Sequence, residues 1–266
     1  MPLKIKKLLP NRNKMKVLYF LYHWLIALPL FIVATAITAI ITSIGSILFS
    51  VDFWGYWPPH YWSKFSCWVF LIRVKVVGKE NIDKKTSYIF VANHQGAFDI
   101  FTIYGFLGHN FKWLMKKSLE KIFLVGDACR NAKHIFVDDS NISSIKDTIA
   151  KAEDTLKDGM SLVIFPEGSR SWDGKMIPFK RGAFMLAGEF NRPVVPLTID
   201  GSFDKLARFD KQVKPGLITL TIHKPIYPGP KGFNTKQLMV QCREEIESAL
   251  AEKDKGISAG QRIEEK

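Results

Sequence analysis

The chain has 266 residues, of which 47% are hydrophobic and 13% aromatic, and it carries a formal net charge of +13. This composition excludes an intrinsically disordered protein, and the length suits one sizeable domain with an appendage. The basic balance favours an anionic partner, such as nucleic acid, a membrane surface or a phosphorylated substrate.

The N-terminal segment is basic and leads into a long uncharged stretch. Residues 1–16 contain six Lys or Arg and no acid, and residues 17–51 contain no Asp, Glu, Lys or Arg. A bilayer span needs about 20 apolar residues, so a straight helix over this stretch would be too long by roughly 20 Å. The alternatives are one tilted span or a helical hairpin dipping into one leaflet, with Pro29 and Gly45 as break points.

The segment that follows, residues 52–70, is rich in amphipathic aromatic side chains. Such rings prefer the membrane–water interface. A hairpin buried in a soluble protein is the alternative, but a long uncharged run beside an aromatic belt would be hard to cover. We therefore predict that residues 1–70 form a basic N-terminus, a membrane-embedded helical hairpin and an aromatic interfacial segment. The rings are Trp54, Tyr56, Trp57, Tyr61, Trp62 and Trp68.

From residue 71 the pattern changes to that of an α/β domain. Apolar runs predict strands at 73–78, 87–93, 161–165, 193–199 and 217–226. Helical patterns occur at 97–107, 140–158 and 235–251. We therefore predict an α/β fold with a mixed sheet flanked by helices over residues 71–252, followed by a polar, frayed C-terminal tail at 253–266.

One motif, NHQGAFD at residues 93–99, follows a predicted strand. A histidine at the carboxyl end of a buried strand lies where open α/β sheets bind ligands, and its ordinary pKa near 6.5 suits proton transfer. Asp99, in the first turn of the next helix, can accept a hydrogen bond from His94 and fix its tautomer. No nucleophile is nearby, so a substrate hydroxyl would take that role. The alternative is that both residues cap the helix.

A second motif, FPEGSRS at residues 165–171, ends another predicted strand, so the sheet should bring it to the same edge. Gly168 and Ser169 can present backbone N–H groups to an anion or oxyanion. Arg170 is a planar cation suited to phosphate, and Glu167 can anchor it or bind a polyol. The alternative is an ordinary turn with a surface arginine.

Four lysines lie between the two motifs, in FKWLMKKSLEK at residues 111–121. Lys112, Lys116, Lys117 and Lys121 form either a solvated helix face or a source of one or two cations for a phosphate beside the second motif. Both alternatives stay open at this point.

The remaining histidines and the cysteines show no metal-binding pattern. The cysteines lie far apart, and we interpret them as buried thiols of a reducing compartment. The histidines match no ligand spacing, so we assign them no role. These residues are Cys67, Cys129, Cys242, His23, His60, His109, His134 and His223.

In this order and spacing, the motifs resemble those of the glycerolipid acyltransferase family, and within it the bacterial 1-acylglycerol-3-phosphate acyltransferases. The resemblance covers roughly residues 70–230. The matching positions are Asn93, His94 and Asp99, residues 165–170, the PFKRGAF segment at 178–184, and the Val-Pro strand at 195–199. The family's second block, Lys-x-Glu-Leu followed by Pro and Gly, is altered here. It reads Lys116, Lys117, Ser118, Leu119, with Phe123 for Pro, Gly126 kept, and Asp139 where a basic residue is common.

The resemblance implies acyl transfer from an acyl-carrier protein or acyl-CoA thioester to the sn-2 hydroxyl of a lysophosphatidic acid, without a covalent enzyme intermediate. It implies that His94 is the general base and that Asp99 orients it, with no metal and no other cofactor. The substrate-binding residues it implies are Glu167, Gly168, Ser169, Arg170 and Lys116 or Lys117.

The resemblance also implies a location. The thioester donors are cytosolic, and the positive-inside rule keeps the basic N-terminus in the cytoplasm, so both must share one side with the catalytic domain. We therefore predict a monotopic enzyme in contact with membrane lipid, on the cytoplasmic face of a bacterial inner membrane.

Three alternatives remain. One is an acyltransferase of the same mechanism that uses another lyso-lipid, such as a lyso-aminolipid. Another is a membrane hydrolase in which His94 activates water. The third is a basic membrane-surface protein that binds nucleic acid, but no aromatic-basic nucleic-acid motif occurs in the α/β part, so we expect no nucleic-acid partner.

Overall fold

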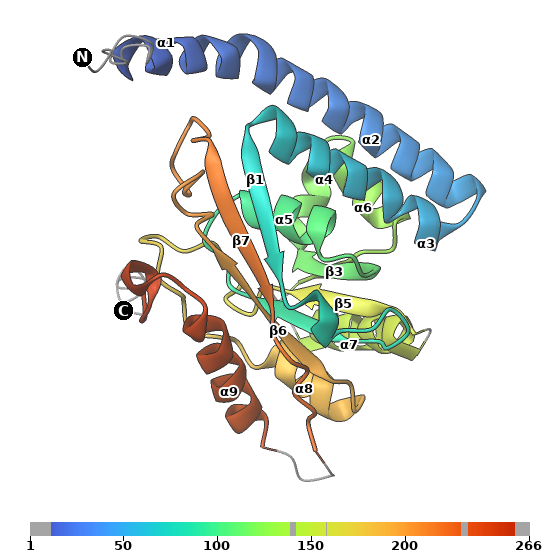
Figure 1. Ribbon diagram of the computed structural model, residues 1–266. Coiled ribbons are helices and arrows are strands. Elements are labelled where there is room, and N and C mark those ends of the chain that lie inside the picture. The colour runs from blue at the N-terminus through green and yellow to red at the C-terminus, as the bar shows by residue number, and fades with distance from the viewer. Residues whose placement is uncertain (1–11, 139–141, 158, 230–233, 259–266) are drawn as a thin grey trace.

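A mixed seven-stranded sheet lies at the centre of the computed structural model, which describes residues 12–138, 142–157, 159–229 and 234–258 (Figure 1). The strand order is β1-β7-β6-β2-β5-β3-β4, and all neighbours are parallel except β6 and β7. The strands are β1 Ile72–Val77, β2 Ile89–Ala92, β3 Phe111–Lys116, β4 Ile135–Val137, β5 Ser161–Ile164, β6 Val194–Asp200 and β7 Gly216–Ile222. The predicted α/β fold with a mixed sheet is confirmed.

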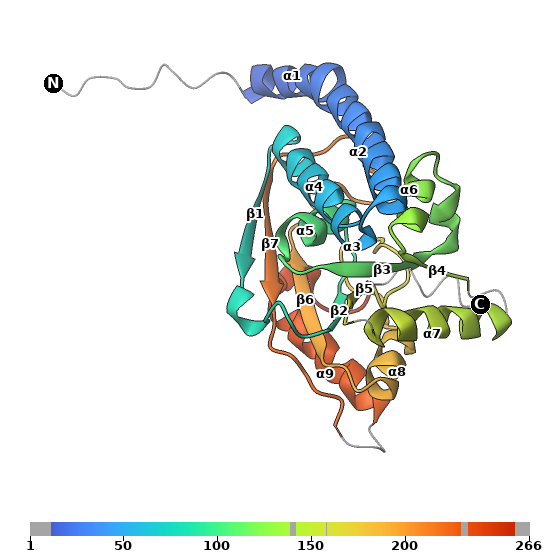
Figure 2. The ribbon, with the colours of Figure 1, turned by 90° about the vertical axis from the view of Figure 1, so that its right-hand side faces the viewer.

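Helices cover both faces of the sheet (Figure 2). Every residue of β2 is buried, because alternate side chains point into two separate cores. Phe90 packs with α4 and α5 on one face, and Ile89 with α7, α8 and α9 on the other. These helices are α4 Trp57–Val69, α5 Phe98–Phe106, α7 Ile142–Lys157, α8 Gly182–Glu189 and α9 Thr235–Ser248.

The five predicted strands and the three predicted helices of the α/β domain are present as β1, β2, β5, β6 and β7 and as α5, α7 and α9. The possible helix at 111–121 is wrong, because this segment forms β3 and the short 3-10 helix η3, Lys117–Lys121. Lys112 interrupts the apolar pattern of β3, so the sequence did not indicate a strand here. The elements β4, α6 (Val125–Asn131) and α8 had no sequence prediction, and neither did the short 3-10 helices at Lys79–Asn81 and Glu252–Asp254.

The N-terminal hairpin turns at a different place from the one predicted. α1 (Arg12–Tyr22), a π-helical turn η1 (His23–Ala27) and α2 (Leu28–Leu48) form one uninterrupted helix, and the chain reverses at 49–56 through α3, Val51–Trp54. The returning arm is α4, so the aromatic segment itself pairs with the apolar helix (Figure 1).

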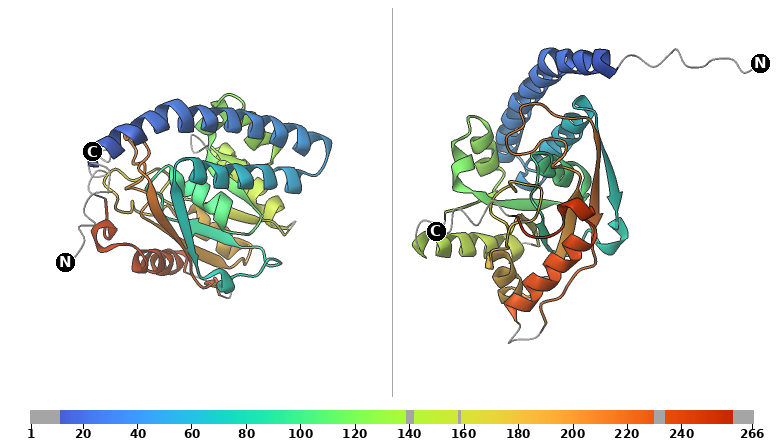
Figure 3. Two further views of the ribbon diagram at one scale, coloured as in Figure 1. Left: turned by 45° about the horizontal axis from the view of Figure 1, so that its top comes forward. Right: turned by 90° about the vertical axis from the view of Figure 1, so that its left-hand side faces the viewer.

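Neither predicted break point interrupts the helix. Pro29 lies in the first turn of α2, directly after η1, where the π-helical turn already departs from regular helical bonding. Gly45 allows close packing instead, since a Cβ there would lie 2.3 Å from the Trp54 ring. By length and composition Asn13–Leu48 can cross a membrane. In this structure it lies across the domain, over α4 and α6 (Figure 3).

The C-terminal tail is not frayed as far as residue 258. The backbone N–H of Ser258 donates to the carbonyl oxygen of Met176 at 3.0 Å, and Asp254 and Ser258 are buried. Arg243 of α9 donates to the carbonyl oxygens of Ile177 and Gly256 at 2.9 and 3.2 Å. These bonds fasten the tail to the segment after the second motif, while the prediction for 259–266 lies outside the described residues.

Candidate active site

The two sequence motifs lie side by side at one edge of the sheet. β2 and β5 are parallel neighbours, so residues 93–99 and 165–171 leave the sheet at the same end. The backbone N–H of Ser171 donates to the carbonyl oxygen of His94 at 2.8 Å. The predicted juxtaposition is therefore confirmed.

His94 and Asp99 form a hydrogen-bonded pair. The distance from His94 Nδ1 to Asp99 Oδ2 is 2.8 Å, so the hydrogen bond expected from the sequence is present. The same oxygen accepts the backbone N–H groups of Gln95 and Gly96 at 2.8 and 2.9 Å, and the carboxylate is fully buried. An ionised carboxylate at Nδ1 favours the tautomer with its proton on that nitrogen, which leaves the Nε2 lone pair available.

The His94 imidazole is also fixed by stacking. It lies on the Phe165 ring with 4.0 Å between centroids and 11° between planes. The ring of Phe165 stacks in turn on Trp113, and His94 keeps 14% of its side-chain surface exposed. The imidazole is thus held in one plane while part of its surface remains accessible.

Asn93 holds a neighbouring strand rather than facing the pocket. Its amide donates to the Ile199 carbonyl oxygen at 2.9 Å and accepts the Ile199 N–H at 2.8 Å. This pair of bonds clamps the end of β2 to β6, so the motif begins from a rigid position.

The prediction that Glu167 binds the substrate needs correction. Its side chain is 2% exposed and does not line the pocket, and its two oxygens accept the backbone N–H groups of His94 and Ile177, both at 2.7 Å. Burial raises the pKa of Glu167 to about 8, although these two hydrogen bonds act in the opposite direction. In this position Glu167 fixes the backbone of His94.

A pocket of 610 Å³ opens beside the histidine. His94, Phe165 and Arg170 line it at the motif end. Its other walls are mostly apolar and come from α2, α4, α6 and the β3 strand. The residues from α2 and α6 are Thr35, Thr38, Ala39, Thr42, Val125, Ala128 and Cys129. An elongated apolar chain with an anionic end fits these walls.

The basic lining differs from the predicted set. Lys116 lines the pocket as predicted. Lys117 does not line it, because its side chain is exposed and pairs with Asp138 at 2.8 Å. Lys112 is buried and pairs with Asp52 of α3 at 3.1 Å. It fastens β3 to the turn of the hairpin.

Gly168 adopts a left-handed backbone conformation that favours glycine. It has φ +73°, and its N–H donates to the Phe165 carbonyl oxygen at 3.0 Å, so this amide does not point at an oxyanion. A Cβ on Gly168 would lie 3.0 Å from Lys180 Cε. The glycine therefore lets Lys180 approach the second motif, and Ser169 lines the pocket next to it.

Sequence reasoning missed two further basic residues of the pocket, Lys180 and Arg208. Lys180 belongs to the 178–184 segment that resembles the family, so a signal existed. Arg208 lies in the loop between β6 and β7, and no pattern marked it. Cys67 and Cys242 are buried as predicted, whereas Cys129 is half-buried on α6. Within the described ranges, no three His, Cys, Asp or Glu side chains gather as a metal site would require.

Comparisons with known proteins agree with this geometry. The family model described as Acyltransferase matches residues 73–200. A 1-acyl-sn-glycerol-3-phosphate acyltransferase of Chlamydomonas reinhardtii is 29% identical over 238 residues, which cover 88% of this chain and 69% of the algal protein. The chloroplastic 1-acyl-sn-glycerol-3-phosphate acyltransferase BAT2 of Brassica napus is 32% identical over 191 residues. That match covers 71% of this chain and 54%, about half, of the Brassica protein.

The fold is also similar to a solved structure. The crystal structure of the 1-acyl-sn-glycerophosphate (LPA) acyltransferase PlsC from Thermotoga maritima aligns with a TM-score of 0.70 and 28% identity. The alignment covers 89% of this chain and 95% of the Thermotoga chain. Coverage of this extent means that the similarity reaches beyond the sheet domain into the N-terminal helices.

Proposed function

Because this chain belongs to the acyltransferase family, we propose that it transfers an acyl group from a thioester to the sn-2 hydroxyl of a 1-acyl-sn-glycerol 3-phosphate and forms phosphatidate. The observation that carries this proposal is the His94–Asp99 pair at 2.8 Å, beside a largely apolar pocket whose lining includes Arg170. The base would act on the acceptor hydroxyl, the apolar walls would hold the acyl chains, and the cation would bind the phosphate.

The proposed chemistry uses His94 as general base. Its Nε2 removes the proton of the acceptor hydroxyl as the oxygen attacks the thioester carbonyl carbon. The tetrahedral intermediate then expels the thiolate, which takes the proton back from the imidazolium, and the ester remains. Asp99 stabilises the imidazolium between these steps through the bond to Nδ1. The thioester is already an activated acyl group, so we propose no metal and no cofactor beyond the acyl donor.

The pocket suggests where the substrates lie. Acyl chains would occupy the walls formed by α2 and α6, where burial of each methylene contributes about 0.8 kcal/mol. The acceptor phosphate would lie against Arg170 and Lys116, since a guanidinium binds phosphate through two parallel hydrogen bonds. The donor would be acyl-CoA or acyl-carrier protein.

The N-terminal helix supports monotopic attachment. One side of α2 lines the pocket through Thr35, Thr38 and Ala39, while its other side exposes large apolar side chains. Because this helix forms a wall of the domain, we propose that it stays against the domain and does not cross a bilayer alone. We propose that α1, α2 and the exposed aromatic rings of α4 lie in one leaflet of membrane lipid, on the cytoplasmic face of a bacterial inner membrane where the donor is available. The exposed rings are Trp57, Tyr61 and Trp68.

A phosphate-free acceptor, such as a lyso-aminolipid, has less support. Basic side chains line the pocket beside His94, and the relatives described above are named for a phosphorylated acceptor. We propose no nucleic-acid partner.

An acyl-transfer assay on the detergent-solubilised protein tests the proposal. Acyl-carrier-protein thioester or acyl-CoA is offered with lysophosphatidate or with 1-acylglycerol, beside the His94→Ala and Arg170→Ala variants. We expect phosphatidate formation by the wild type, complete loss in His94→Ala and a large loss in Arg170→Ala. Undiminished activity of His94→Ala would refute the mechanism. Turnover of phosphate-free acceptors alone would refute the proposed acceptor.

A further inference from the structure

The loop between β6 and β7, residues 201–215, packs directly on the first motif. The backbone N–H of Ala97 donates to the carbonyl oxygen of Leu206 at 3.2 Å. A Cβ on Gly96 would lie 2.5 Å from the carbonyl oxygen of Ser202, so the loop and the turn after His94 touch through their backbones. The backbone of this loop is therefore fixed against the turn that follows His94.

Arg208 of this loop is held in a defined position. Its guanidinium carbon lies 4.0 Å above the centre of the Trp172 ring, and one of its N–H groups donates to the carbonyl oxygen of Arg170 at 3.3 Å. Phe209 packs on the same indole with 5.2 Å between ring centroids. Arg170 belongs to the second motif and Trp172 follows it directly, so Arg208 is fixed relative to that motif.

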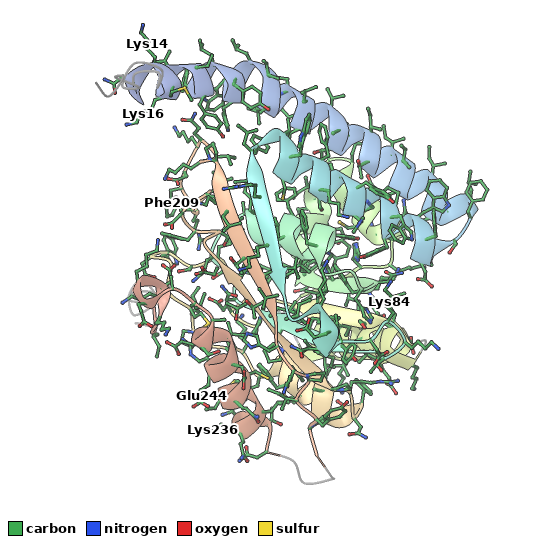
Figure 4. All side chains as sticks on the ribbon, in the orientation of Figure 1. Lys14, Lys16, Lys84, Phe209, Lys236 and Glu244 are labelled. Atoms are coloured by element: carbon green, nitrogen blue, oxygen red, sulfur yellow. The ribbon has the colours of Figure 1, made fainter. Side chains whose placement is uncertain are left out.

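No described Asp or Glu side chain forms an ion pair with Arg208. The same is true of Arg170 within the described part of the chain, and both arginines line the pocket that contains His94. The carbonyl bond uses one of the five guanidinium donors of Arg208. Phe209 is 69% exposed and lies at the edge of the molecule, below α1 (Figure 4). The pocket thus has a second guanidinium that can bind an anionic ligand.

We propose that Arg208 is a second arginine for the phosphate of the acceptor and acts together with Arg170; this inference rests on the proposed function. Two guanidinium groups match the charge of a phosphate monoester, which approaches −2 near neutral pH. Stacking on Trp172 restricts the rotamers of Arg208 before the ligand arrives, so less conformational entropy is lost on binding.

Kinetics of matched variants test this assignment. Arg208→Gln removes both the charge and the planar guanidinium, whereas Arg208→Lys keeps the charge alone. The control is Lys211→Gln, which removes the charge of an exposed residue in the same loop that does not line the pocket. We expect Arg208→Gln to raise the KM for lysophosphatidate roughly ten- to hundredfold, the range for a lost charge-assisted hydrogen bond. The Lys variant should lie between it and the wild type, and Lys211→Gln should match the wild type.

Two further arms distinguish binding of the acceptor phosphate from anchoring of the loop and from binding of the donor. The KM for the acyl donor and the turnover of 1-acylglycerol should stay unchanged in Arg208→Gln. An equal loss of activity with 1-acylglycerol and with lysophosphatidate would show that Arg208 only holds the loop in place, and would overturn the proposal. A KM increase confined to the donor would assign the arginine to a phosphate of the donor, and would overturn it too.

A binding measurement keeps this inference separate from the proposed function. Titration of lysophosphatidate into His94→Ala and into His94→Ala/Arg208→Gln, in the same detergent, needs no turnover. Weaker binding by the double variant supports Arg208 even if the wild type does not acylate this acceptor, in which case only the proposed function fails. Equal binding by the two variants refutes the role of Arg208.

Discussion

The backbone N–H of His94 donates a hydrogen bond of 2.7 Å to Glu167, a residue of the other motif. The second carboxylate oxygen binds the N–H of Ile177 at the same distance. Glu167 therefore joins three segments of the chain below the imidazole, where no substrate reaches it. Its contribution to acyl transfer would come through the position of His94.

Replacing Glu167 by Gln should change how stability depends on pH. Burial raises the pKa of Glu167 to about 8, from an ordinary value of 4.5. The folded protein thus binds this proton more tightly than the unfolded chain, and the stabilisation is complete below about pH 4.5. It is lost as the pH rises towards 8, by about 5 kcal/mol at most. The difference in Tm between the wild type and Glu167→Gln should narrow over that range in thermal unfolding experiments.

Glu189, an exposed residue of α8, supplies the control. Glu189→Gln should follow the pH dependence of the wild type. A Glu167→Gln curve that runs parallel to that of the wild type from pH 5 to 8 would contradict the assignment of this slope to Glu167.

Asp99→Asn should impair the chemical step more than substrate binding. The amide can still accept one N–H bond, but it no longer holds the proton on Nδ1 or stabilises the imidazolium. In an analogous base–carboxylate pair this change lowers kcat roughly 10⁴-fold. We expect a loss of at least about 10³-fold in kcat with little change in KM, measured as initial rates over a range of both substrates. Activity within tenfold of the wild type would rule out Asp99 as the residue that orients His94.

The His94–Asp99 contact was predictable because it is local. The two residues are five positions apart, and the change from a strand to a helix places them on the same turn. Glu167 was recognised as part of a motif but given the wrong partner, since its contacts with His94 and Ile177 depend on how β2 and β5 pair. A carboxylate three positions before an arginine suggested an ion pair that the fold does not form.

Other features of the site depend on contacts between distant segments. The burial of Lys112 depends on Asp52, which is sixty positions earlier and comes from the hairpin turn. Arg208 enters the pocket because its loop packs on Gly96 and Trp172, and nothing in its own neighbourhood indicates this. Composition predicted the long apolar helix but not the position of the hairpin turn, since the turn depends on Trp54 packing over Gly45.

Removal of Asp52 should destabilise the fold through Lys112. The lysine side chain is 5% exposed, so loss of its partner leaves a buried charge without compensation. Asp52 is 59% exposed, and we therefore expect Asp52→Asn to cost about 1–3 kcal/mol of unfolding free energy, less than for a fully buried pair. Lys112→Met in the Asp52→Asn background should recover most of this loss, because an apolar chain then fills the site. Chemical denaturation in detergent measures both effects.

The pair between Lys117 and Asp138 is the matched control, since it has a similar distance of 2.8 Å but a lysine that is 57% exposed. Lys117→Met should change the unfolding free energy by less than about 1 kcal/mol. Failure of Lys112→Met to recover stability would show that Asp52 acts through something other than the buried charge.

The loop that carries Arg208 is also hydrogen-bonded to the long N-terminal helix, which leads to a last prediction. Tyr19 of α1 donates its hydroxyl proton to the carbonyl oxygen of Val213 at 2.9 Å, and the N–H of Val213 donates to His23 at 3.3 Å. Tyr19→Phe removes the first bond, worth about 1 kcal/mol, so the KM for lysophosphatidate should rise roughly fivefold. Tyr22→Phe deletes an equivalent hydroxyl that bonds Val69 at 2.8 Å, away from the loop, and should leave this KM unchanged. If the helix acts through the loop, Tyr19→Phe should add little once Arg208→Gln is present, whereas fully additive effects would show that the two residues act independently.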